Sequence, residues 1–212
     1  MEFILYEVIN LTTASTAPDS FKEVCLIGII DSTGGSEVQF AALTEDITAM
    51  DWGDKDIEGK PLVNGGRVVG WTPQSDESIT MKMYPVTALK NGTGMVQWMH
   101  PQSTPDATQP IAVDNSRNRD THRLILTWAS TLPATAGAAT TADGTTTIYR
   151  IQIVNAYMTS YKPSFDDKHF SAEVTFKWAP FDKSGTANKR EESCDGSAIL
   201  PAAGTSTTSL AS

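Results

Sequence analysis

The sequence predicts a mainly β protein, a β-barrel or sandwich with a short flanking α-helix and extended β-hairpins. Three observations support this fold class: alternating apolar and polar runs recur along the chain, turn-forming residues separate many of them, and helical periodicity is scarce. With 212 residues, 40% of them hydrophobic and 19% charged, the chain is long enough to bury a core. No apolar run reaches the roughly 20 residues that cross a bilayer, so we expect no membrane span.

The expected elements follow in chain order. The strand-like runs are residues 3–9, 24–30, 37–43, 47–52, 66–72, 78–84, 122–129, 147–161 and 168–179. The candidate helix lies within residues 86–99, where Leu89, Val96 and Met99 share one face. Because Asn91-Gly92-Thr93-Gly94 interrupts this face, we expect a short helix after Gly94.

Residues 1–197 are predicted to form one domain. Within it, residues 130–147 are rich in Thr and Ala and predict an exposed loop between two strands. Residues 198–212 have a similar composition and predict a flexible C-terminal tail. Cys25 lies in an apolar run and Cys194 in a polar one, so two separate thiols are favoured over a disulfide.

A first hairpin is predicted over residues 65–86. In its second run, Ile79, Met81 and Met83 alternate with polar residues and therefore share one face of a strand. Residues 72–77, TPQSDE, supply the turn residues between its two runs.

A second, longer hairpin is predicted from Thr147 to Trp178. Its first run places Tyr149, Ile151, Ile153, Tyr157 and Tyr161 on one face, and its second run places Phe170, Ala172, Val174, Phe176 and Trp178 on one face. At about 3.3 Å per residue the first run spans on the order of 45 to 50 Å. A common strand spans about 17 to 20 Å. We therefore expect this ribbon to extend beyond the core of its own subunit.

A projecting hairpin cannot leave its edges unpaired without a risk of aggregation. We therefore predict that copies of the chain lie side by side and continue one another's sheets. The residues predicted to close such a ring share the apolar faces of the two hairpins: Ile79, Met81, Met83, Ile151, Ile153, Val174 and Phe176.

The net charge of −9 is unevenly distributed. Residues 1–60 hold 12 of the 25 acidic residues and 3 of the 16 basic residues. One part of the folded surface should therefore be acidic, which disfavours binding to a nucleic-acid backbone. Arg117, Arg119 and Arg123 form one basic segment, for which pairing with the acidic first third is favoured over phosphate binding.

Two segments resemble metal sites only weakly. DWGDKDIEG contains Asp51, Asp54, Asp56 and Glu58, and oxygen-rich loops of this kind can bind Ca²⁺. The spacing is not that of an EF-hand, so an exposed acidic turn is favoured. DDKH at residues 166–169 is favoured as turn chemistry at a hairpin tip. We predict no metal and no cofactor.

Local catalytic motifs are missing from the sequence. There is no Gly-x-Ser-x-Gly elbow, no phosphate-binding Gly-x-x-x-x-Gly-Lys-Ser/Thr loop, no His-Glu-x-x-His and no Cys-x-x-Cys. Two scattered carboxylates of a glycosidase would leave no local pattern, so a hydrolase stays open as a third alternative. The prediction is that the chain is not an enzyme.

Residues 38–196 resemble the major tail tube proteins of tailed viruses of bacteria and archaea. The resemblance rests on the order of segments: EDITAMDWGDKDIEGKPLVNGGRVVGWTPQSDESITMKMYPV, a Thr-rich insertion, the long hairpin and FKWAPFDKSGTANKREESCDG. It implies a tail-tube-like barrel or sandwich with a flanking helix, related in fold to the tubes of injection systems and type VI secretion. Residues 130–147 depart from this pattern and are expected on the outer surface.

The resemblance implies a structural virion protein that assembles into stacked hexameric rings, made in the host cytoplasm and located in the virion tail. Ring stacking would use Asp51, Asp54, Asp56 and Glu58. Partners would be other copies of the chain, with sheath, tape-measure and tail-terminator proteins as further candidates. Genomic DNA would pass through the lumen without specific binding, helped by an acidic wall. The alternative is a β-sandwich carbohydrate- or receptor-binding module of a virion or cell surface.

Overall fold

The computed structural model describes residues 24–31, 37–85, 120–129, 133–141, 148–166, 169–194 and 198–210. These residues form strands and one 3-10 turn, η2 (Thr44–Asp46), and none of them lies in an α-helix. The predicted strand at residues 3–9 and the predicted helix after Gly94 lie outside the described residues. Within the described part of the chain, no helix could span a membrane.

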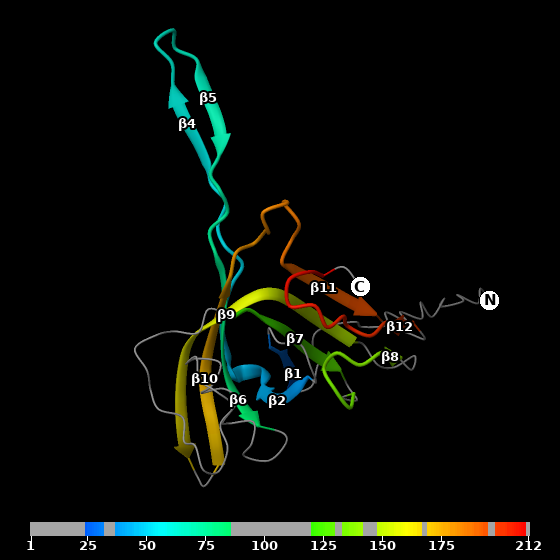
Figure 1. The fold of residues 1–212 in the computed structure, drawn as a ribbon. Helices are drawn as coiled ribbons and strands as arrows, with labels where there is room; N and C mark the ends of the chain where they lie inside the picture. The colour runs from blue at the N-terminus through cyan, green and yellow to red at the C-terminus, as the bar shows by residue number, and fades with distance from the viewer. Residues whose placement is uncertain are drawn as a thin grey trace, which may run out of the picture.

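Six antiparallel strands form a closed barrel (Figure 1). They are β1 (Val24–Ile30), β2 (Val38–Leu43), β6 (Glu77–Pro85), β7 (His122–Ala129), β9 (Ile148–Asp166) and β10 (His169–Trp178). Their order is β10, β6, β2, β1, β7, β9, and β9 pairs again with β10 to close the wall. Two strands flank the barrel, since β3 (Ile47–Asp51) pairs with β6 and β11 (Lys189–Cys194) pairs with β9. The predicted mainly β class is confirmed.

Alternating side chains fill the barrel. Along β6 every second residue from Glu77 to Met83 is buried, and β10 alternates in the same way from Ala172 to Trp178. The inward residues of β1, β2, β7 and β9 complete one apolar cluster with them. Because six strands leave an interior that side chains can fill, this cluster is the core of a single chain.

The long strand β9 bends where its alternation breaks. Asn155 has a positive φ of 54°, and at this point β9 uses one residue more than β7 between two paired positions. A second irregularity lies opposite Thr175 and Phe176 of β10. Such bulges increase the bend and twist of a strand. They turn Ala156 and Met158 inward and leave Tyr157 exposed, so the prediction that Tyr157 shares a face with Ile151 and Ile153 is wrong.

The bend lets one strand serve two parts of the wall. Residues 148–153 of β9 pair with β7 and with β11, and residues 157–166 pair with β10. The expected length of the ribbon is confirmed, because β9 contains 19 residues. Much of this length wraps around the barrel instead of leaving it.

Strand β7 is buried on both faces. Its outer face is covered partly by residues 133–141, where Ala136 packs against Leu26, Ile30 and Ile125. The C-terminal residues add a short pairing, since β12 (Ile199–Leu200) pairs with β8 (Thr140–Thr141). The described part of the predicted exposed loop therefore includes a buried residue.

Residues 198–210 lie along the barrel, and their main-chain carbonyls accept hydrogen bonds from buried arginines. Arg150 donates to the Pro201 carbonyl at 2.6 Å, and Arg123 donates to the carbonyls of Ser206 and Ser209 at 3.0 and 3.2 Å. Leu210 is buried. The flexibility of this tail stays a prediction, but its described residues contact the barrel.

An arm projects from the barrel (Figure 1). It consists of β4 (Ile57–Pro61) and β5 (Arg67–Trp71), which pair with one another and with no other strand of the described chain. The sequence predicted that the run at residues 66–72 would pair with the run at residues 78–84, and this pairing is wrong. Residues 72–76 instead return the chain from the arm to β6 in the barrel.

Candidate functional site: the arm and the apolar pocket

The arm is a two-stranded ribbon with a defined tip. The Leu62 and Gly66 main chains are joined by a 2.7 Å hydrogen bond, and Gly65 has a φ of 83° that favours glycine. Below the strands the ladder is continued by side chains: the hydroxyls of Thr72 and Ser75 accept hydrogen bonds from the Asp56 and Asp54 amides at 2.8 and 2.9 Å. The arm therefore has a regular, hydrogen-bonded course down to its base.

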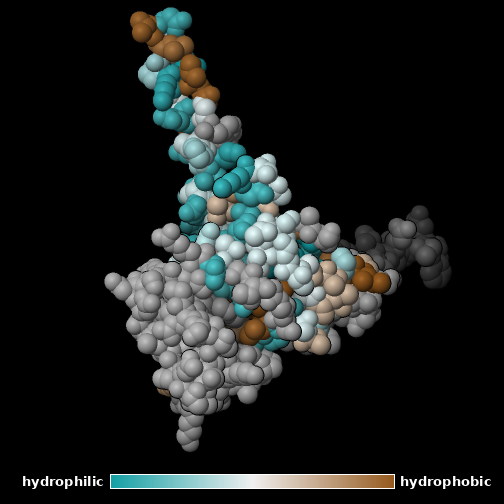
Figure 2. All heavy atoms as spheres, in the orientation of Figure 1, coloured by the Kyte–Doolittle hydropathy of each residue, from teal (hydrophilic) through white to brown (hydrophobic). Residues whose placement is uncertain are grey.

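Apolar side chains are exposed along the arm. They are Ile57, Leu62, Val63, Val68 and Val69, and Val63 at the tip is fully exposed. Figure 2 shows hydrophobic residues gathered at the end of the arm, beside hydrophilic ones. An isolated hairpin has no second layer on which to bury such residues, and exposed apolar clusters mark interaction sites.

The base of the arm is fixed to the barrel through Glu77. Gln74 donates hydrogen bonds to the Trp52 carbonyl at 2.8 Å and to Glu77 at 3.0 Å. Lys189 of β11 lies 3.9 Å from the Glu77 carboxylate, and its ammonium group stands 3.7 Å from the centre of the Trp52 ring. These contacts hold the segments that enter and leave the arm against the barrel wall.

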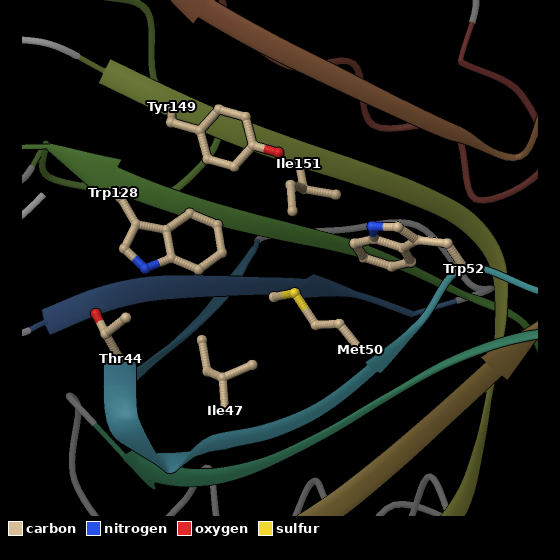
Figure 3. Close-up of a pocket in the computed structure, with 7 residues that line it drawn as sticks. All are labelled: Thr44, Ile47, Met50, Trp52, Trp128, Tyr149 and Ile151. Atoms are coloured by element: carbon tan, nitrogen blue, oxygen red, sulfur yellow. The ribbon is translucent and has the colours of Figure 1, made fainter. Parts of the chain in front are cut away.

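An apolar pocket of about 540 Å³ lies beside this base (Figure 3). Its walls come from η2, from β3 and the residue after it, and from the inner faces of β7 and β9. The lining residues are Thr44, Ile47, Met50, Trp52, Trp128, Tyr149 and Ile151. Tyr149 donates a 2.8 Å hydrogen bond to Glu191, and burial together with this bond raises the pKa of Tyr149 to about 12. The pocket is therefore neutral inside, and Tyr149 keeps its proton at physiological pH.

The acidic residues predicted for ring stacking lie along the arm and its base. Asp51 ends β3, Asp54 and Asp56 lie between β3 and β4, and Glu58 lies within β4. The favoured interpretation of this segment as a turn is wrong for Glu58, because residues 57–61 form a strand. Among the residues that the structure describes, no group of three or more metal-ligating side chains converges. The stacking role stays a prediction.

The residues predicted for ring closure lie inside the barrel. Ile79, Met81, Met83, Ile151, Ile153, Val174 and Phe176 all belong to the core cluster, and none of them is more than 1% exposed. Their side chains pack against one another within one chain, since the barrel closes on itself. In this fold these side chains face the barrel interior, and a contact with a neighbouring copy would need exposed residues.

The far end of the ribbon offers such residues. Tyr157 and Phe165 are exposed, and the Phe165 ring lies 5.1 Å from that of Phe170. Lys162 and Glu173 form an exposed ion pair across the two strands at 2.6 Å. Alternation predicted the ribbon, but the exposure of Tyr157 follows from the bulge at Asn155, which the sequence pattern did not reveal.

The basic segment is only partly described. Arg117 and Arg119 lie outside the described residues. Arg123 is buried on the outer side of β7, where it donates to Gln152 and to C-terminal carbonyls. Burial lowers the pKa of Arg123 to about 10, and the nearby Arg190 and Arg150 act in the same direction. Arg123 therefore has a packing role and does not face solvent phosphate.

No protein-family model matches the chain, and no curated protein matches it. Solved structures do match. The anti-feeding prophage cap, a tube-terminating cap, is 12% identical over 79% of this chain and 88% of its own, with a TM-score of 0.37. A chain of the PVC sheath–tube complex, from an extracellular contractile injection system, is 13% identical over 80% and 88%, with a TM-score of 0.35. Hcp1 from E. coli EAEC 042 is 9% identical over 82% and 99%, with a TM-score of 0.34.

These matches are similarities of tube, cap and Hcp proteins to this chain, at low identity and low structural score. They establish no membership of a family.

Proposed function

We propose that the chain is a structural subunit that assembles with its own copies into a tube. The observation that carries the proposal is the arm, a two-stranded ribbon that projects from a closed barrel and exposes apolar residues along its length. The barrel core is complete without it, because the core cluster contains no residue of β4 or β5. The arm exposes apolar side chains to solvent and contributes nothing to the core. Contact with another molecule best explains such an element.

The end of the β9–β10 ribbon supplies a second contact surface. Residues 157–166 of β9 pair with β10 along one edge. Within the described part of the chain no strand pairs with their other edge. A strand edge with the exposed aromatic residues Tyr157 and Phe165 can add to the sheet of a neighbour. Repetition of this contact around an axis would close a ring.

In detail, we propose rings of six copies that stack through their arms into the tail tube of a virus or the tube of an injection system. In a viral tail the genome would pass through the lumen, and the acidic bias of the chain would reduce adhesion of its phosphates. Sheath, tape-measure and terminator proteins are the proposed neighbours. No catalytic step is assigned to the chain.

Electron microscopy of the purified protein tests this function. We expect rings or tubes in negative stain, and a sedimentation profile that shifts to larger species as the concentration rises. A protein that stays monomeric at every accessible concentration would contradict the proposal.

A carbohydrate-binding module is the second candidate, because three aromatic residues line the pocket: Trp52, Trp128 and Tyr149. Aromatic rings present large apolar faces that a sugar ring can cover. Specific hits on a glycan array, lost in Trp52→Ala and accompanied by monomeric protein, would favour this function over the tube.

A further inference from the structure

We infer that the arm tip of one copy, residues 60–67, inserts into the apolar pocket of another copy. The inference rests on the proposed assembly and names the two surfaces that meet. It follows from three properties of the described residues: matching polarity, opposite charge, and a separation that prevents the contact within one chain.

Polarity matches on the two surfaces. The tip presents Leu62 and Val63, and the structure shows no second layer that shields them. The pocket is concave, about 540 Å³ in volume, and its lining is almost entirely apolar. A pocket of this size accommodates a few side chains. Burial of Val63, which is fully exposed, and of Leu62 would remove both from water.

Charge is also complementary. The tip carries Lys60 and Arg67 and no acidic residue. Lys60 has an exposed carboxylate, Glu58, at 3.8 Å, and a pair of this kind contributes little. Near the pocket, Glu45 and Asp51 directly follow the lining residues Thr44 and Met50 in the sequence, and Asp51 lies close enough to Glu77 to raise its pKa.

Two further charged groups stand at the pocket. Glu191 accepts the hydrogen bond of Tyr149. The cation at the pocket, Lys189, is already paired with Glu77 and with Glu191 at 3.9 and 3.4 Å. Acidic residues thus outnumber the one lysine among these groups, and a basic tip would be attracted to this region.

The contact must form between copies. The pocket lies at the base of the arm, where Trp52 leads into it, and the arm extends away from the barrel (Figure 1). A convex patch and a complementary pocket at different places on one chain make a head-to-tail contact, which builds a filament when its rotation does not close into a ring. This is the geometry that stacking requires.

Disulfide trapping between two differently tagged proteins tests the contact directly. One protein carries Val63→Cys and the other Met50→Cys, both with Cys194→Ser, and the native Cys25 is fully buried. A disulfide forms only when the two α-carbons come within about 7 Å. We expect a mixed-tag dimer at roughly ten times the yield of either protein oxidised alone. The matched control replaces Val63→Cys by Ile199→Cys, a change at an exposed apolar residue away from the arm.

Charge reversal provides an independent test. Lys60→Glu with Arg67→Glu should lower the fraction of assembled protein about tenfold. Adding Glu45→Lys and Asp51→Lys in the same chain should restore it. Restoration supports the contact, because four changes that only damaged the fold would not compensate one another.

The outcomes separate this inference from the proposed function. Tubes without the mixed-tag dimer would overturn the arm-to-pocket contact and leave the tube in place. A mixed-tag dimer without tubes would support the contact and contradict the tube. Only monomers, with no dimer, would overturn both.

Discussion

The indole N–H of Trp178 donates a 2.7 Å hydrogen bond to the carboxylate of Glu77, and both side chains are buried. Trp178 ends the barrel strand β10, and Glu77 begins β6, directly after the segment that returns from the arm. The bond therefore joins the barrel core to the base of the arm. Transfer of a charged carboxylate from water to a buried site is unfavourable. The stability of this junction should therefore depend on the charge of Glu77.

Stability should depend on pH through Glu77. Burial raises the pKa of Glu77 above its usual value of 4.5 and outweighs the opposing effects of Trp178 and Lys189. A raised folded-state pKa means that the stabilising contribution is complete below pH 4.5 and is lost as the pH rises through the folded-state pKa. Urea unfolding over a pH series should therefore show wild type losing free energy of unfolding relative to Glu77→Gln as the pH rises. Parallel pH profiles of the two proteins would contradict this.

Removal of the Arg150 side chain should destabilise the fold strongly. This guanidinium is buried, contacts Glu192 at 2.8 Å and donates to the Pro201 carbonyl. Arg150→Met should cost on the order of 3 to 5 kcal/mol, because it removes the buried arginine that pairs with the partly buried Glu192. Chemical denaturation measures the loss. Arg190→Met is the matched control: its side chain is 38% exposed and also pairs with Glu192, so its loss should stay below about 1 kcal/mol. Equal losses would disprove the role assigned to burial.

The bend of β9 should depend on the backbone at Asn155. Its φ of 54° lies in the left-handed region, and its side chain donates a 2.9 Å hydrogen bond to Asn188. Asn155→Ala and Asn155→Gly both remove that hydrogen bond, but only alanine is strained by the backbone. Thermal and chemical unfolding should show alanine less stable than glycine by about 1 kcal/mol. Equal stability of the two variants would mean that the bulge is not held in this conformation.

Two phenylalanines of the ribbon should separate folding from assembly. Phe176 is fully buried, so Phe176→Ala should cost about 3 to 5 kcal/mol in the free energy of unfolding. Phe165 is 78% exposed, so Phe165→Asp should leave the unfolding free energy nearly unchanged and reduce ring formation. Denaturation and sedimentation measure the two effects. Normal rings from Phe165→Asp would remove the ribbon end from the proposed contact.

The alternation of apolar and polar residues in the sequence predicted many of the barrel strands. Strands β6 and β10 were predicted from it within a few residues, because each buries every second side chain. The arm was missed in part because its first strand, IEGKP, contains Gly, Lys and Pro and lacks alternation. Strand pairing is set by tertiary contacts, so the partner of residues 66–72 could not be read from their own pattern.

The burial of the residues predicted for ring closure was missed for a related reason. The apolar faces of the two hairpins were correctly identified, but their burial within one closed barrel depends on which strands pair. Position Asn155 carried one usable signal, since Asn is among the residues that tolerate a positive φ. No sequence signal indicated that Arg123 and Arg150 are buried, because their burial depends on carbonyl groups far along the chain.

The wall of the barrel has one weak seam. Within the part of the chain that the structure describes, strands β2 and β6 pair at Phe40–Pro85 and Ala41–Tyr84, whereas β9 and β10 share a long ladder. Pro85, at the end of β6, has no amide hydrogen to donate across this seam. The barrel should therefore open there first, and whichever of the Phe40 and Ala41 amides points toward β6 should exchange with deuterium faster than the amides of residues 172–176. Assembly of the subunits should suppress this opening. Slower amide exchange at the seam would therefore report that a subunit has been incorporated into an assembly.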